Sequence, residues 1–164
     1  RNCNFMLCNI FRFSANFNKI THLHVRTRTS DISVNHNRLE TLKCDNELAV
    51  DSFRAKYNRL RDLQCIRLMK NLINLDLIGN KFENFHAKDF ELMQNLHNLK
   101  LAENPLTQLG PDIFGNLNVL QYLIIENSII NHSEISTLYP NLTIVETPDE
   151  YVKMQFEFFK DPNV

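Results

Sequence analysis

Histidine and cysteine are the residues of this chain that could hold a metal ion or act as nucleophiles, and both are few. The sequence contains six histidines and four cysteines. His22 and His24 have strand spacing, which would place both imidazoles on one exposed face, but a zinc site needs a third ligand that no neighbour supplies. We find no recognisable catalytic motif in the sequence: no Cys/His or Ser/His/Asp set, no Gly-rich phosphate loop and no carboxylate pair at a spacing typical of an active site. We therefore expect no catalysis, no metal site and no cofactor.

An apolar frame with one asparagine recurs along the chain and must position whatever functional side chains exist. It is clearest at Leu72, Leu75, Leu77, Asn80 and Phe82, and again 24 residues later at Leu96, Leu99, Leu101, Asn104 and Leu106. Further copies are anchored on Asn18, Asn37 and Asn58, and Ser128 and Thr147 take the anchor place in two more. Such a frame is typical of a leucine-rich repeat solenoid. It predicts about seven turns over residues 10–147.

Each part of the frame has a structural role. Leu-x-Leu predicts a short strand whose alternate side chains point inward. Stacked turns would pair these strands into a parallel sheet on the concave face of a horseshoe-shaped α/β solenoid. The asparagine amide can satisfy backbone groups where the chain bends away from the strand. We expect the turns of Ser128 and Thr147 to be less regular, because a hydroxyl does this only in part.

The return sides differ between the two halves of the chain. In three early turns an apolar pair follows the bend at strand spacing, which predicts an extended return: Leu23 and Val25, Leu42 and Cys44, Leu63 and Cys65. The two 24-residue turns instead carry Phe85 with Phe90 and Leu109 with Phe114. Their extra residues allow a helical turn, with a phenylalanine filling the wider interior.

Three stretches resemble known families. The segment LHNLKLAENPLTQLGPDIFGNLNVLQYL resembles the 24-residue repeat of extracellular animal leucine-rich repeat proteins. The shorter turns, ISVNHNRLETLKC and VDSFRAKYNRL, resemble those of insect leucine-rich immune proteins. The resemblance implies a secreted protein-binding module, with a role in innate immune recognition or complement-like control.

The four cysteines form two candidate pairs. Cys3 and Cys8 lie in residues 1–9, which we expect to cap the open end of the repeats, and extracellular family members often close that end with disulfides. Cys44 and Cys65 occupy one column in consecutive turns, about one strand spacing apart. They could form a disulfide, although two buried thiols acting as small apolar fillers are favoured. The sequence does not choose among the pairings.

Two triplets are acceptors for N-glycosylation, at Asn131 and Asn141. We expect Asn131 to lie in a loop after its bend, and Asn141 to lie beside a strand on the concave face, where a sugar is less readily accommodated. The chain ends with a capping box at Thr147–Glu150 and apolar residues at helical spacing, which predict an amphipathic helix over residues 148–164. This helix would cap the core or dock on a partner.

Charge divides the chain into two halves. Residues 1–70 carry 13 Lys or Arg against 6 Asp or Glu, a net of +7, and residues 71–164 carry 5 against 13, a net of −8. Such a dipole favours head-to-tail association or oriented docking. No stretch has the ~18 apolar residues that a membrane span needs. The chain opens with Arg1 and no secretory signal, which suggests a mature or trimmed product.

The frame also predicts which side chains point outward from the sheet. Phe17, His36 and Tyr57 should stack beside Arg54 and Lys56, residue types that dominate interface energetics. A second candidate surface is an apolar patch of Ile78, Tyr122 and Ile124. The aromatic residues could equally pack for stability alone.

The function that these features favour is binding of another protein by a secreted leucine-rich repeat module. One alternative is binding of a polyanion, such as nucleic acid or a sulfated glycan, through Arg26, Arg28, Arg54, Lys56, Arg59 and Arg61. Another alternative is an intracellular scaffold, which would have free thiols and no sugar.

Overall fold

The computed structural model describes residues 2–4, 11–25, 29–44, 48–107, 109–126 and 130–145. Several expected features lie outside these residues: Cys8 and most of the N-terminal segment 1–9, the helix expected over 148–164, the anchors Ser128 and Thr147, and the candidate cations Arg26 and Arg28.

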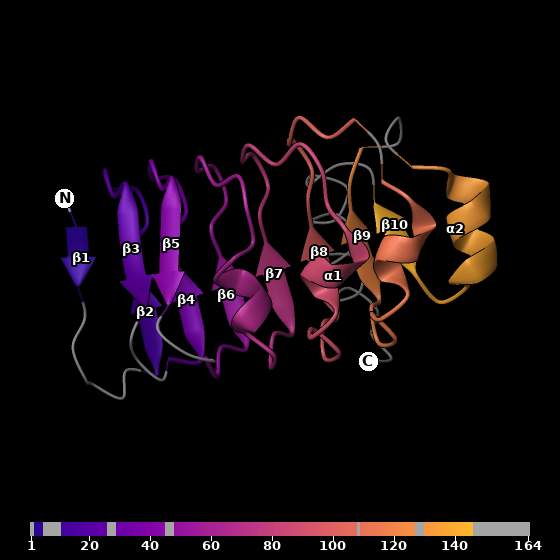
Figure 1. Cartoon of the computed structure of the whole chain (residues 1–164), viewed down its shortest axis with the longest axis horizontal. Helices are drawn as coiled ribbons and strands as arrows, with labels where there is room; N and C mark the ends of the chain where they lie inside the picture. The colour runs from indigo at the N-terminus through magenta and orange to yellow at the C-terminus, as the bar shows by residue number, and fades with distance from the viewer. Residues whose placement is uncertain are drawn as a thin grey trace, which may run out of the picture.

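A seven-stranded parallel sheet runs along one side of the chain (Figure 1). Its strands are β2 (Arg12–Ser14), β4 (Asp31–Ser33), β6 (Ser52–Arg54), β7 (Asn74–Asp76), β8 (Asn98–Lys100), β9 (Tyr122–Ile124) and β10 (Thr143–Val145). Neighbouring strands pair in register, so that Phe13 faces Ile32, Ile32 faces Phe53 and Phe53 faces Leu75. Each strand lies where Leu-x-Leu spacing predicts one.

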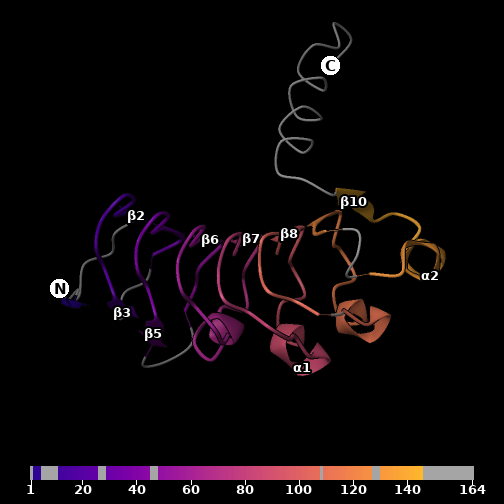
Figure 2. The same ribbon diagram turned by 90° about the horizontal axis from the view of Figure 1, so that it is seen from above.

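A second sheet occupies the opposite side in the N-terminal half (Figure 2). It contains β1 (Asn2–Asn4), β3 (His22–Val25) and β5 (Thr41–Cys44), paired in parallel in that order. The extended returns expected at Leu23 and Leu42 are therefore confirmed.

The prediction of an extended return at Leu63 and Cys65 is wrong. Cys65 has helical dihedral angles and precedes a 3₁₀-helix, η1 (Ile66–Leu68). Ile66, Met69 and Leu72 recur every third residue and are all buried, which matches the three-residue period of a 3₁₀-helix and not the two-residue period of a strand.

The later returns are helical, as expected for the two 24-residue turns. They contain α1 (Ala87–Phe90) and η2 (Pro111–Phe114), and Phe90 and Phe114 are buried. A further helix, α2 (His132–Leu138), was not expected: Asn131 accepts a hydrogen bond from the Glu134 backbone N–H and so caps this helix. No helix in the described part of the chain is long and apolar enough to cross a lipid bilayer.

One apolar core extends along the stack from Ile20 to Ile135. Beside it runs a ladder of asparagine side chains that joins each turn to the next. The Nδ2 of Asn80 donates to the carbonyls of Leu77 (2.9 Å) and Ala55 (2.9 Å), and its Oδ1 accepts from the Leu60 N–H (3.1 Å). Asn37, Asn58 and Asn104 make the same set of bonds in their own turns. The expected role of the asparagines is confirmed for these four. Asn18 occupies the equivalent position at the N-terminal end of the ladder, where its Nδ2 donates to the Ala15 and Asn16 carbonyls of its own turn.

Candidate functional site

Three aromatic side chains stack at the ends of the first three strands of the large sheet. We call Phe17, His36 and Tyr57 the aromatic row. The rings of Phe17 and His36 are parallel, with centroids 4.5 Å apart and an interplanar angle of 6°. His36 and Tyr57 are 4.8 Å apart and tilted by 44°. The row forms because backbone hydrogen bonds continue past the strands, from the N–H of Phe17 to the Asn35 carbonyl (2.9 Å) and from that of His36 to the Lys56 carbonyl (2.8 Å).

The residue before each ladder asparagine has a left-handed backbone. The φ angles are 56° at Phe17, 53° at His36, 54° at Tyr57, 66° at Gly79 and 58° at Glu103. This conformation costs a residue with a side chain about 1–2 kcal/mol, and aromatic residues do not normally adopt it. The bend that turns the asparagine inward thus also fixes the direction of each aromatic side chain. Strained backbone of this kind is enriched at functional sites.

Tyr57 anchors one end of the aromatic row. Its hydroxyl donates to Oε1 of Glu103 (2.9 Å), which lies two turns further along the chain. Lys56 places its ammonium group 4.8 Å from the centre of the Tyr57 ring. The opposite end is open, because Phe17 is 77% exposed and no other described ring covers its outer face. The row therefore ends in an aromatic ring face that is exposed to solvent.

The apolar patch expected at Ile78, Tyr122 and Ile124 is not exposed as expected. Ile78 and Ile124 are 2% and 1% exposed, and Tyr122 is half-buried. The reason is lateral packing: Ile78 and Ile124 form a second apolar cluster with Ala102 and Val145, and the Tyr57 ring packs against it. The two isoleucines thus belong to the apolar cluster on which the Tyr57 end of the aromatic row rests.

Charged side chains on the outward face of the sheet pair with one another. Asp31 accepts from Arg54 (2.7 Å) and lies 3.2 Å from Arg12. Burial raises the pKa of Asp76, although Lys100, the Ile78 N–H, Lys56 and Arg54 all favour its ionised form. Burial likewise lowers the pKa of Lys100, against the attraction of Asp76. Arg54, expected as a contact residue, is thus already held by a carboxylate.

A row of basic side chains lies on the other side of the asparagine ladder. The sequence reasoning named only one of its members, Arg59, and missed the row. We call Lys19, Arg38, Arg59 and Lys81 the basic row; each follows a ladder asparagine directly, and all four are exposed. Their backbones stack turn on turn, since the N–H of Arg38 donates to the Ile20 carbonyl (3.0 Å) and that of Lys81 to the Leu60 carbonyl (2.9 Å). The signal was present as Asn-Lys or Asn-Arg in four successive turns.

Neither a scan of protein-family models nor a search of curated proteins finds a match to this chain. The function must therefore be argued from the site itself.

Half of the cations proposed for polyanion binding have carboxylate partners. Arg54 pairs with Asp31, Arg59 with Glu40 (3.1 Å) and Arg61 with Glu83 (3.8 Å). Arg26 and Arg28 lie outside the described residues. Of the four members of this set that the structure describes, three are therefore paired with carboxylates.

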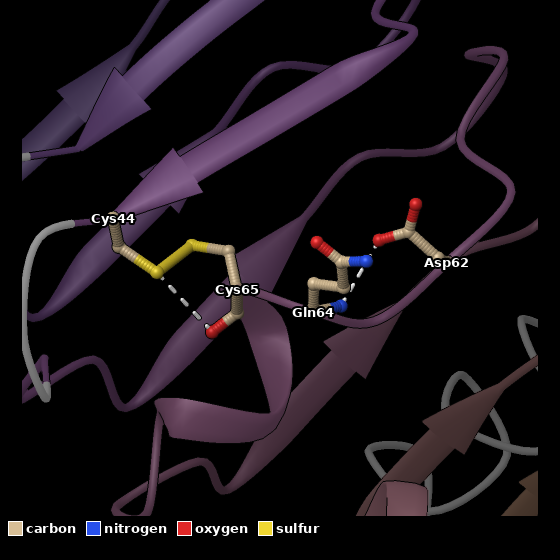
Figure 3. Close-up of a disulfide and its surroundings, with 4 residues drawn as sticks. All are labelled: Cys44, Asp62, Gln64 and Cys65. Atoms are coloured by element: carbon tan, nitrogen blue, oxygen red, sulfur yellow. Dashed lines mark hydrogen bonds between the residues drawn. A yellow bond between two sulfur atoms is a disulfide. The ribbon is translucent and has the colours of Figure 1, made fainter.

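Cys44 and Cys65 lie at disulfide-bonding distance, with Cα atoms 5.6 Å apart (Figure 3). This is the pairing that the sequence placed second to two buried thiols. Cys65 reaches Cys44 because the chain turns into η1 at this point, and the N–H of Gln64 donates to Oδ1 of Asp62 (3.0 Å) as the turn begins. The bond would join the end of β5 to the start of η1, where the second sheet stops.

The remaining candidate positions are the two glycosylation acceptors and the two histidines of β3. Asn131 and Asn141 both lie at the surface, Asn131 as the cap of α2 and Asn141 just before β10. On β3, His22 is exposed and His24 half-buried. Among the described residues, no three His, Cys, Asp or Glu side chains are arranged to hold a metal ion.

Proposed function

We propose that this chain is a secreted leucine-rich repeat domain, built of about seven turns, that binds another protein through the aromatic row. The repeat assignment is supported by the parallel sheet and by the asparagine ladder. By its resemblance to insect immune proteins, the module would serve innate immune recognition or complement-like control.

The observation that carries this proposal is the aromatic row. Three successive turns hold an aromatic side chain in a backbone conformation that such residues avoid, and they do so at the molecular surface. The outermost ring, Phe17, buries little area in the described structure, so fold stability gives little reason for it. An exposed aromatic residue beside cations is a typical centre of a protein interface.

Secretion is supported by the cysteine pair and by the exposed acceptor triplets. Disulfides persist in oxidising compartments and are rare in the cytosol, so the distance between Cys44 and Cys65 favours an extracellular protein over an intracellular scaffold. An exposed Asn131 or Asn141 could carry a glycan without disturbing the apolar core.

Site-specific photocrosslinking tests the proposal. A photoreactive phenylalanine analogue replaces Phe17, and the purified protein is illuminated in extracellular fluid from its source. Phe11 provides a matched control, since it is 80% exposed, belongs to the same turn and lies at the other end of β2. We expect a protein adduct from position 17 that is weak or missing from position 11. Equal adducts from both positions, or none from position 17, would refute the proposed site.

A further inference from the structure

The aromatic row and the basic row form one composite surface. They flank the same asparagine ladder: in the first three turns an aromatic residue precedes the asparagine and a cation follows it. Both rows run across the strands, along the stack of turns. Because successive turns are joined by backbone hydrogen bonds, neighbours in each row are separated by roughly one strand spacing, ~4.8 Å. Together they form a strip with rings on one side and positive charges on the other.

Most of the cations in the basic row have no partner within the described structure. Lys19, Arg38 and Lys81 have no carboxylate within ion-pair distance among the described residues, whereas Arg59 pairs with Glu40. Arg12 and Arg54 on the sheet face, in contrast, both pair with Asp31. A line of unpaired, exposed cations attracts a ligand of opposite charge.

The surroundings of the strip discriminate between kinds of anionic ligand. Glu40 and Glu83 lie one column beyond the basic row and are exposed. Glu40 pairs with Arg59 and Glu83 with Arg61, so the edge of the strip carries charges of both signs. Such an edge suits a chain whose charges are spaced and mixed better than a ligand with a negative charge on every unit, such as a sulfated glycan or a nucleic acid. Carboxylates on alternate residues of an extended peptide recur about every 7 Å, within reach of flexible lysine and arginine side chains.

We infer that this strip binds an extended acidic segment of the protein partner. Its carboxylates contact the basic row, and an aromatic side chain of the segment continues the stack on the open face of Phe17. The inference rests on the proposed protein-binding function and names the chemistry of the partner. It also explains why the aromatic and the basic residues occur in the same turns. Neither the stability of the fold nor a diffuse basic surface requires the two kinds of residue to occur together.

Matched charge reversals test the inference with a defined probe. The probe is a short fluorescent peptide in which glutamate alternates with tyrosine, and its binding is measured by fluorescence anisotropy. One variant reverses the three unpaired cations of the strip: Lys19→Glu, Arg38→Glu and Lys81→Glu. The control reverses three exposed cations on the return side of the molecule: Lys43→Glu, Arg67→Glu and Lys88→Glu. Both triples change the net charge equally and exchange the same residue types.

We expect the strip variant to bind the peptide at least about tenfold more weakly, and the control variant to lose less than about twofold. Phe17→Ala should also weaken binding, whereas Phe11→Ala should not. Circular dichroism checks that the variants fold, and the neutral triple of Lys19→Gln, Arg38→Gln and Lys81→Gln replaces the strip variant if it does not.

Four results would overturn the inference. The first is equal loss in the two triples, and the second is no binding of the peptide. The third is a heparin oligosaccharide that binds more tightly than the peptide and depends on the same cations. The fourth is self-association that the strip variant abolishes, which would make a second copy of the chain the occupant. A photocrosslink from position 17 that survives in the strip variant would leave the proposed function standing and refute only the acidic segment.

Discussion

The Tyr57 ring lies directly over the Cα of Gly79, the equivalent residue of the next turn. A Cβ atom added to Gly79 would lie 2.2 Å from Cδ1 of Tyr57 and 2.6 Å from Cε1. The absence of a side chain at position 79 therefore lets the tyrosine cross a whole turn and reach Glu103. Gly79 ends the aromatic row for the same reason, because the space for a further ring is already filled by Tyr57.

Gly79→Ala should destabilise the protein by about 2–4 kcal/mol, through the left-handed φ and the collision with Tyr57. Urea denaturation measures the free energy of unfolding. Gly115→Ala is the control, since Gly115 has φ −56° and an added Cβ would lie 3.3 Å from the Asp112 carbonyl oxygen, a tight contact that a small shift relieves, and its cost should be only about 1 kcal/mol. The Tyr57→Ala/Gly79→Ala double variant should lose less than the sum of the single changes. Strict additivity would show that the two residues do not collide.

Asn80→Ala should cost about 2–4 kcal/mol of unfolding free energy. Asn80 is 1% exposed and bonds to three backbone groups at 3.1 Å or less. Alanine leaves the buried Leu60 N–H without its acceptor and removes one of the two asparagine donors from each of the Ala55 and Leu77 carbonyls. Asn18→Ala is the matched control. Asn18 is exposed and donates only to carbonyls of its own turn, so its replacement should cost less than about 1 kcal/mol. Equal costs for the two variants would mean that bonds between turns contribute nothing beyond the local bend.

A reducing agent should destabilise the wild-type protein by about 2–4 kcal/mol, because the Cys44–Cys65 bond closes a loop with a sequence separation of 21. The Cys44→Ser/Cys65→Ser variant is the control, since any effect of the reductant that remains in it comes from other cysteines. Mass spectrometry after alkylation without reduction counts the free thiols. Alkylation of both Cys44 and Cys65 in the native protein would restore the interpretation as two buried thiols.

Asp76 should make the protein less stable as the pH rises from acid towards neutral. Its folded pKa is raised above the usual 3.8 by burial, so the folded protein binds a proton at this site more readily than the unfolded chain. The free energy of unfolding then falls as the pH rises through that interval. Asp76→Asn removes this titration. The stability of the wild type relative to the variant should therefore decrease with rising pH in urea denaturation, and a flat or increasing difference would contradict the prediction.

The surface chemistry could be predicted only in part, and particular residues show why. The stacking of Phe17 on His36 follows from sequence, since both residues precede a ladder asparagine in neighbouring turns and must lie side by side. The basic row follows by the same logic, although the sequence reasoning overlooked it. The pairing of Arg54 with Asp31 and the burial of Ile78 and Ile124 do not follow, because they depend on how outward side chains of different turns pack together.

The sequence by itself determined the elements that repeat. Leu-x-Leu spacing is sufficient to place each strand, because alternation assigns one set of side chains to the core, and a recurrent asparagine can bond only where the chain bends. The tertiary structure decided what depends on contacts between turns. Tyr57 reaches Glu103 across Gly79, Cys65 turns into η1 towards Cys44, and Asp76 is half-buried beside Lys100. The local sequence pattern does not predict any of these contacts. Each joins residues at least 20 positions apart, and the distance between them is set by the stacking of whole turns.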